Sequence, residues 1–172
     1  MGSLRSLLLS AALLCGCSPA LDWRQTTPAE LGVLALFPCR PATLTRQVLV
    51  LQQRSPMVMH ACSAGGNTFA VSGVAIGDVR DVTPAIEFLR DAAARNLGAV
   101  GGAAQPLAVP GMTPSAQAGR FVLRGRRPDG SAVTEHLLLF AHGARVYQAS
   151  VVGDAPDEAA VATFFGGLKV MS

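Results

Sequence analysis

MVMHACSAGGNTFAVSGVAI, residues 57–76, decides which kind of fold this chain adopts. Two apolar runs, 57–63 and 68–76, flank the short segment Gly65-Gly66-Asn67. Apolar runs on either side of such residues are typical of two antiparallel strands and the tight turn that joins them. The stretch therefore predicts a β-hairpin within an antiparallel meander.

Further short apolar runs lie on both sides of this hairpin. Residues 53–56 are expected to form a turn before it, because they are polar and end in Pro56. Pro128-Asp129-Gly130 and His142-Gly143 are expected turns of a second meander. The five strands expected outside the hairpin are 32–37, 46–52, 120–126, 132–141 and 145–152.

Two segments change from the strand period to the helical period. Thr83 is the expected cap of a helix that begins at Pro84 and ends at Gly98, and a second helix is expected to open at Asp154 and to end at Gly166-Gly167. Strands followed by amphipathic helices predict an α+β fold, in which an antiparallel sheet is packed by two helices as an α/β sandwich. The expected apolar faces are Ile86, Leu89, Ala93 and Leu97 in the first helix and Val161, Phe164, Phe165 and Leu168 in the second.

The N-terminus has the pattern of an export signal. Arg5 is followed by the apolar run 7–14, which is too short to span a bilayer because a spanning helix needs about 20 apolar residues. Leu14-Cys15-Gly16-Cys17 resembles the lipobox of bacterial lipoproteins, and Cys15 does not fit its register because Leu14 would occupy the small-residue position. The resemblance implies cleavage before Cys17 and acyl chains on that residue; two or more chains are needed for a stable anchor. An ordinary cleaved signal peptide is the alternative.

This interpretation predicts both the domain organisation and the cellular location. Residues 1–16 are the signal peptide, 17–30 the lipidated N-terminus and tether, and 31–172 a single α+β domain. The protein is expected in the cell envelope, lipid-anchored and facing the periplasm. Ser18 after the lipidated cysteine favours, by the same resemblance, the outer membrane over the inner one.

Cys39 and Cys62 are the two cysteines that follow Cys17. One pair of cysteines in an exported chain is most simply a disulfide, since export leads to an oxidising compartment. Closing a loop of about 22 residues stabilises a fold by about 3 kcal/mol in the chain-entropy model. A zinc site is disfavoured by the ligand spacing. A nucleophilic Cys62, with His60 on the same face of a strand, is the remaining alternative.

The composition and motifs do not point to catalysis. The chain has 14 Lys and Arg against 11 Asp and Glu, which argues against a nucleic-acid binder with a concentrated basic face. There is no G-x-S-x-G elbow and no Gly-rich loop leading to Lys and Ser or Thr. The histidines His60, His136 and His142 are scattered, and Glu135 should face away from its neighbour His136 on a strand. We therefore expect no catalytic residues, no metal site and no cofactor.

Two segments are candidates for contact with partners. Arg124, Arg126 and Arg127 form a basic patch around a turn, and either solvation or contact with an anionic lipid or lipopolysaccharide phosphate would explain it. Residues 98–119 are rich in Gly and Pro, which predicts a long mobile connection and a candidate protein-partner surface.

The layout resembles the PsbP-like and DcrB-like α/β-sandwich lipoproteins of bacteria. The resemblance rests on the FPxxP motif at 37–41, the mid-chain helix, and the closing segments VYQASVVG and AAVATFFGGLKV. Ala162-Thr163-Phe164-Phe165-Gly166-Gly167-Leu168 stands where that family has a helix of the form x-x-FF-x-S-[FL]. Gly166-Gly167 departs from the commoner polar residue. These motifs are structural, so the resemblance implies a fold and a compartment rather than an activity.

The sequence thus predicts a membrane-anchored envelope lipoprotein that is not an enzyme and that binds or supports another envelope component. The alternative is a small-ligand- or metal-binding, enzyme-like periplasmic domain that uses the sheet face near His60 and Cys62.

Overall fold

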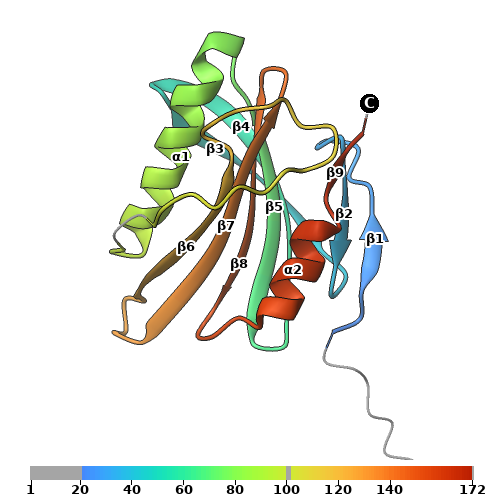
Figure 1. Cartoon of the computed structure of the whole chain (residues 1–172), viewed down its shortest axis with the longest axis vertical. Coiled ribbons are helices and arrows are strands. Elements are labelled where there is room, and N and C mark those ends of the chain that lie inside the picture. The colour runs from blue at the N-terminus through green and yellow to red at the C-terminus, as the bar shows by residue number, and fades with distance from the viewer. Residues whose placement is uncertain (1–20, 100–101, 172) are drawn as a thin grey trace, which may run out of the picture.

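The computed structural model describes residues 21–99 and 102–171. They form a mostly antiparallel α+β fold of three layers, with a six-stranded sheet in the middle (Figure 1). One helix covers the left face of this sheet in the figure, and a second helix and a small sheet cover the right face. No helix among the described residues is both long and apolar enough to cross a bilayer.

The central sheet has the strand order β3-β4-β5-β8-β7-β6, and every neighbouring pair is antiparallel. Two meanders, as expected from the sequence, therefore make up this sheet, and they are joined by the pairing of β5 with β8. The strands are β3 (Ala42–Val50), β4 (Gln53–Ala64), β5 (Asn67–Ala75), β6 (Gly119–Arg126), β7 (Ala132–His142) and β8 (Arg145–Gly153).

Strand β7 is buried on both faces, because Leu137, Leu138, Leu139 and Phe140 are each 0% exposed. Side chains alternate between the faces of a strand, so Leu138 and Phe140 pack on one side and Leu137 and Leu139 on the other. The run of consecutive apolar residues in the sequence is explained by these two cores.

The left-hand layer is α1 (Val82–Asn96), which follows the short 3₁₀ turn η1 (Val79–Asp81). Ile86, Leu89 and Ala93 are buried against the sheet, as their helical spacing predicts. The expected start at Thr83 and Pro84 is wrong: the helix begins at Val82, whose burial one turn before Ile86 extends the apolar face.

The right-hand layer is built from α2 (Glu158–Gly166) and the three-stranded sheet β1-β2-β9. The expected opening of α2 at Asp154 is wrong. Asp157 caps the helix by accepting a hydrogen bond from the Ala160 N–H at 2.9 Å, and Pro156 disfavours a helical conformation before it. The small sheet comprises β1 (Arg24–Thr26), β2 (Val33–Phe37) and β9 (Lys169–Val170).

Residues 21–30, the described part of the segment expected as a tether, pack on the domain. Strand β1 pairs with β2, and the Trp23 ring lies 6.0 Å from the Phe69 ring in an edge-on contact. Residues 1–20, which include the predicted signal peptide and Cys17, lie outside the described part of the chain.

The turn expected at residues 53–56 is also misplaced. Those residues are the first part of β4, and the chain reverses at Leu51 and Gln52, both of which have positive φ. A two-residue turn of this kind matches the twist of a hairpin, but its usual sequence signal is Asn or Gly, which is missing here.

Candidate functional site

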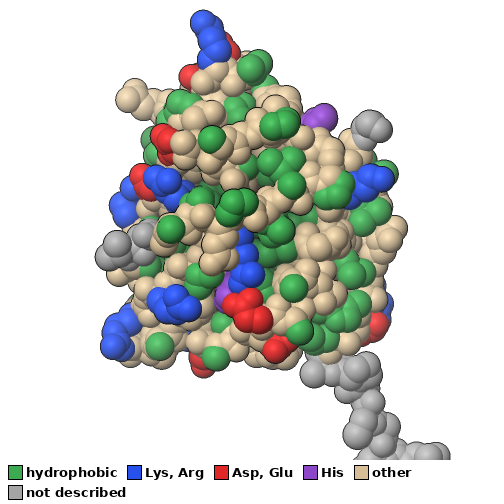
Figure 2. Space-filling model, in the orientation of Figure 1, with side chains coloured by type: hydrophobic (Ala, Val, Ile, Leu, Met, Phe, Trp, Pro, Cys, Tyr) green, Lys and Arg blue, Asp and Glu red, His purple; other side chains and the backbone are tan. Residues whose placement is uncertain are grey.

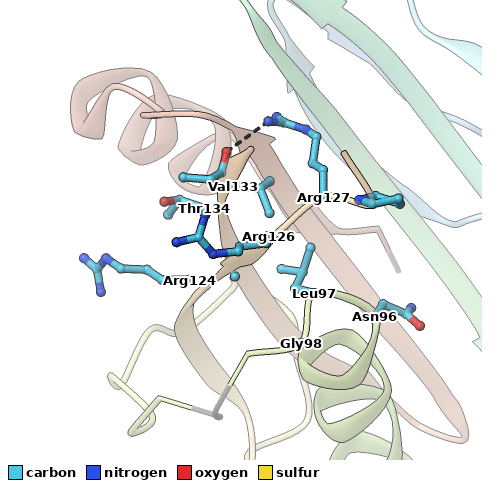
Figure 3. Close-up of a pocket in the computed structure, with 11 residues that line it drawn as sticks. Asn96, Leu97, Gly98, Arg124, Arg126, Arg127, Val133 and Thr134 are labelled. Carbon is cyan, nitrogen blue, oxygen red and sulfur yellow. Dashed lines mark hydrogen bonds between the residues drawn. The ribbon is translucent and has the colours of Figure 1, made fainter. Parts of the chain in front are cut away.

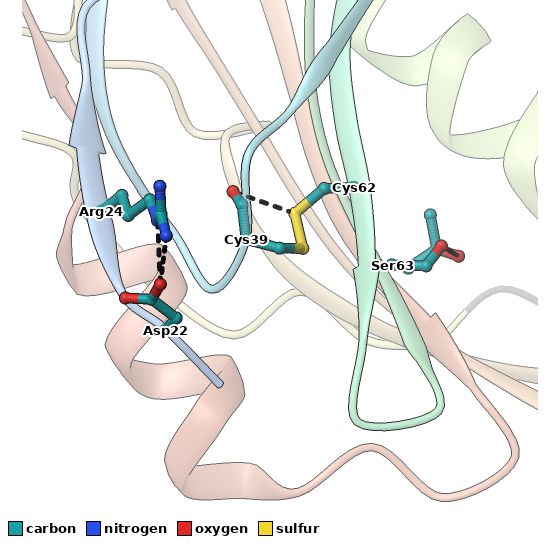
Figure 4. The surroundings of a disulfide bond; sticks show 6 residues. Asp22, Arg24, Cys39, Cys62 and Ser63 are labelled. Carbon is teal, nitrogen blue, oxygen red and sulfur yellow. Dashed lines mark hydrogen bonds and ion pairs between the residues drawn. A yellow bond between two sulfur atoms is a disulfide. The ribbon is translucent and has the colours of Figure 1, made fainter. Parts of the chain in front are cut away.

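The predicted disulfide is present. Cys39, which follows β2, is bonded to Cys62 on β4, so the bridge ties the small sheet to the central sheet (Figure 4). The thiol chemistry considered for Cys62 is therefore unavailable in this state, because its sulfur is already bonded. The bridge adds a covalent link between two layers that also meet through apolar side chains and through the Tyr147–Leu31 hydrogen bond.

His60 lies on the same face of β4 as Cys62, two residues away. It is 8% exposed; its Nδ1 is 3.2 Å from the Thr43 hydroxyl, and its Nε2 has no hydrogen-bond partner and lies 3.8 Å from a Glu30 carboxylate oxygen. His60 is thus buried between Thr43 and Glu30. Within residues 21–99 and 102–171, no three His, Cys, Asp or Glu side chains gather as a metal-binding group would.

The three arginines of the basic patch are brought together beside a groove of about 650 Å³ at the β6–β7 hairpin (Figure 3). The C-terminal end of α1, at Asn96 and Leu97, forms the other wall. The groove depends on close packing at Gly125, since a Cβ there would lie 2.0 Å from the Leu97 carbonyl oxygen. That carbonyl also accepts a hydrogen bond from the Arg126 N–H at 3.0 Å, which fixes the end of α1 against β6.

The three arginines are not equivalent. Arg127 donates to the Asp154 carboxylate at 2.6 Å and to the Ala132 carbonyl at 3.0 Å, so its charge is matched within the domain. Arg126 donates to the Gly130 carbonyl at 2.8 Å, which orients the guanidinium without neutralising it. Arg124 is exposed and forms no ion pair with another described residue. Arg124 and Arg126 are therefore the two cations available to an outside anion.

Arg120, His136 and Glu158 form a second polar cluster. In Figure 2, basic, acidic and histidine side chains adjoin one another near the middle of the face shown. The Arg120 guanidinium donates to Glu158 and contacts His136 Nδ1, both at 2.6 Å. The hydrogen bond from Arg120 lowers the pKa of the Glu158 carboxyl, and burial lowers the pKa of the His136 imidazole. A neutral His136 can accept from Arg120, so the cluster joins the first turn of α2 to the β6 and β7 strands.

Sequence reasoning missed this cluster, although it correctly placed Glu135 and His136 on opposite faces of β7. His136 is opposite Val122 and Glu135 is opposite Leu123, a neighbouring pair of positions on β6. Glu135 is buried on the α1 side, and burial raises its pKa to about 7. The only sequence signal for the cluster was the charge of Glu158 at a helix start, which indicates a dipole contact rather than a partner 38 residues away.

The Gly- and Pro-rich connection is held to the domain at several points rather than running free over residues 102–118. Gln105 and Arg120 exchange two backbone hydrogen bonds of 2.8 Å, and Thr113 N–H donates to the Ala141 carbonyl at 2.7 Å. Val109 is buried in the core between the central sheet and the layer of α2 and the small sheet. The connection crosses the front of the molecule in Figure 1, from the α1 side to the small sheet.

Comparison with known proteins does not assign the chain to a family. No protein-family model matches the chain, and no curated protein sequence matches it.

Proposed function

We propose that the chain is a lipid-anchored envelope protein that faces the periplasm and acts as a binding or structural module rather than as an enzyme. The observation that carries the proposal is the Cys39–Cys62 disulfide, because such bonds persist in oxidising compartments and are rare in the cytosol. The lipobox-like sequence ending at Cys17 supports attachment to the membrane. The motifs that resemble the PsbP-like and DcrB-like lipoproteins support the same compartment.

The short chain between Cys17 and Leu21 limits how far the folded domain would lie from the proposed anchor. Leu21 packs at the turn between β4 and β5, where its Cδ2 lies 3.3 Å from the place a Cβ would occupy at Gly65. From Cys17 to Leu21 the chain advances by four residues, so it can extend at most about 14 Å. An acylated Cys17 would hold the folded domain close to the bilayer.

The experiment is to express the full chain and the variant Cys17→Ala in a bacterium and to analyse both membranes and N-termini. We expect the unaltered chain in the membrane fraction, beginning at Cys17 and carrying the mass of its acyl chains. Cys17→Ala should lack the added mass and leave the membrane, while Cys15→Ala, the matched control, should be lipidated normally. An unprocessed, cytosolic chain with reduced cysteines would overturn the proposal.

A role for this module in contact with another envelope protein is tested by cross-linking in intact cells. The 102–118 segment is the surface we expect to be involved, because it is irregular yet held in place by the contacts described above. A neighbour recovered through this segment, and lost when the segment's exposed Leu107 is changed to Asp, would support it. Cross-links found only outside the segment would argue against it.

A further inference from the structure

We propose that the groove containing Arg124 and Arg126 binds the phosphates of anionic phospholipid headgroups in the leaflet that holds the lipid anchor, and so sets how the domain lies on the membrane. This inference rests on the proposed lipid anchor at Cys17. It adds a binding surface, the chemistry of its ligand and an orientation, none of which follows from the anchor alone.

The register of the central sheet puts the groove and the tether at the same end of the molecule. Thr68, which follows the β4–β5 turn, pairs with Val152 on β8. The next residue, Gly153, pairs with Thr134 on β7, and Thr134 pairs with Arg124 on β6. The β4–β5 turn, where Leu21 packs, and the β6–β7 hairpin therefore project from one edge of the sheet, at the bottom of Figure 1.

The β4–β5 turn and the β6–β7 hairpin are also close enough for both to touch one flat membrane surface. Three strand spacings separate β5 from β6, which amounts to about 15 Å. The tether allows at most about 14 Å between Cys17 and Leu21. A domain held this closely at the β4–β5 turn presents the β6–β7 hairpin to the same leaflet, with two points of contact rather than one.

The ion pairs at this end of the sheet leave only some of its arginines available to bind phosphates. Two acidic side chains there are paired with arginines: Asp154 accepts from Arg127 and Glu158 accepts from Arg120. Asp129 accepts from the Ser131 hydroxyl and N–H, which lowers the pKa of its carboxyl, so it keeps a negative charge at the hairpin, and Asp157 accepts from the Ala160 N–H at the start of α2. Arg124 and Arg126 lack such a carboxylate partner among the described residues, and arginine is well suited to phosphate because its N–H donors form a planar fork.

The C-terminal end of α1 would oppose an anion if its carbonyls were free, because that end of a helix carries partial negative charge. Here the Leu97 carbonyl accepts from Arg126 N–H, and the Ala94 carbonyl accepts from both Leu97 and Ala99. Capping of these carbonyls reduces the opposing field in the groove. The Gly130 carbonyl also accepts a hydrogen bond from the Arg126 guanidinium. Because that side chain is already oriented, it loses less conformational entropy when it binds a phosphate.

The test measures which end of the lipidated full chain touches a bilayer. A fluorophore is attached through Pro128→Cys at the hairpin, or through Val79→Cys at the other end of the sheet, where Val79 is 67% exposed. Each protein is reconstituted in phosphatidylcholine vesicles with or without phosphatidylglycerol, and quenching by headgroup spin labels is recorded. Because the native cysteines are bonded to each other or acylated, only the introduced thiol takes the label.

We expect strong quenching at position 128 and none at position 79, and only when phosphatidylglycerol is present. The ratio of contacting to free hairpin should fall about fivefold for each of Arg124→Gln and Arg126→Gln, and should weaken with salt. Arg46→Gln on β3 removes the same charge from an exposed site and should change nothing. Circular dichroism melting of each variant checks that the fold is kept.

Four outcomes would overturn the inference. Equal quenching at both positions, or no effect of the two arginine variants, removes the orientation while leaving the anchor intact. Loss of quenching when inorganic phosphate replaces chloride at equal ionic strength would assign the groove to a soluble phosphate instead. A chain that does not float with the vesicles at all would overturn the proposed anchor, and this orientation with it.

Discussion

The two layers that cover the central sheet are built in opposite ways. The α1 layer is one continuous helix of 15 residues, with its apolar face on the sheet. The layer on the other side is assembled from a nine-residue helix, strands of three, five and two residues, and the coil at 102–118. A long helix can bury its face alone, whereas short pieces need cross-links, and the disulfide, the Tyr147–Leu31 hydrogen bond and the Arg120–Glu158 ion pair all lie on this second side.

The largest effect is expected for a substitution of Phe164, at the centre of the layer formed by α2 and the small sheet. Phe164 is 0% exposed, and its ring lies 5.3 Å from those of Phe37 and Phe69, so it joins α2 to the small and central sheets. Phe164→Ala should lower the free energy of unfolding by about 3–5 kcal/mol, measured by urea denaturation. Ile86→Ala is the matched change on the α1 side, with an expected loss of about 2–5 kcal/mol.

Hydrogen exchange of these two variants tests the comparison itself. Protection should fall first in β1, β2 and α2 for Phe164→Ala, because several short elements depend on that ring. In Ile86→Ala the loss should be spread over α1 and the strands beneath it. Identical exchange patterns in the two variants would show that the layers do not differ in this way.

Removing the disulfide should have a smaller effect, confined to the same layer. The double variant Cys39→Ala and Cys62→Ala is expected to lose about 3 kcal/mol of unfolding free energy, because the unfolded chain regains the freedom of the closed loop. Calorimetric melting of the variant, with the reduced native protein as its control, measures this. A melting temperature unchanged in both would contradict the idea that the bridge holds the small sheet in place.

The smallest expected effect is on the α1 side of the sheet and concerns Glu135, which is buried there with its pKa raised to about 7. The folded protein keeps the Glu135 proton at pH values where the unfolded chain has lost it, so this group destabilises the fold as pH rises from about 4.5 toward 7. Glu135→Gln should remove this dependence and raise the unfolding free energy at pH 8 by at most about 3 kcal/mol, the value that a pKa raised from 4.5 to about 7 corresponds to, because the buried Gln amide offsets part of the gain.

Urea denaturation at pH 5 and pH 8 measures the effect of Glu135. The control is Asp91→Asn, which removes one carboxylate from the exposed side of α1. If the difference in unfolding free energy between the native protein and Glu135→Gln were the same at pH 5 and pH 8, the raised pKa would be contradicted.

The strands and helices were predictable wherever local pattern and burial agree. The hairpin at 57–76, the second meander and the apolar faces of both helices appear where their periods place them. The errors fall where the local signal is absent or competes with packing. Leu51 and Gln52 form a turn without turn residues, and Val82 joins α1 because it is buried beside Ile86. Strand β9 has two residues, too few for any period to be seen.

The candidate site was predictable only in part. The arginines at 124, 126 and 127 were identified from their clustering along the chain, and their place beside a groove required the end of α1 to pack at Gly125. The Arg120–His136–Glu158 cluster was not predicted, since its members come from two strands and a helix.

By itself the sequence determined most of the longer strands and helices and the pairing of its two domain cysteines, because each depends on residues close together or on a simple count. Only the tertiary structure decided that Leu21, Arg124 and Arg126 lie at the same end of the sheet, and which polar groups are buried. Those properties depend on strand register and layer packing, which bring residues together across the chain and are set by the free energy of the whole fold rather than by any local segment.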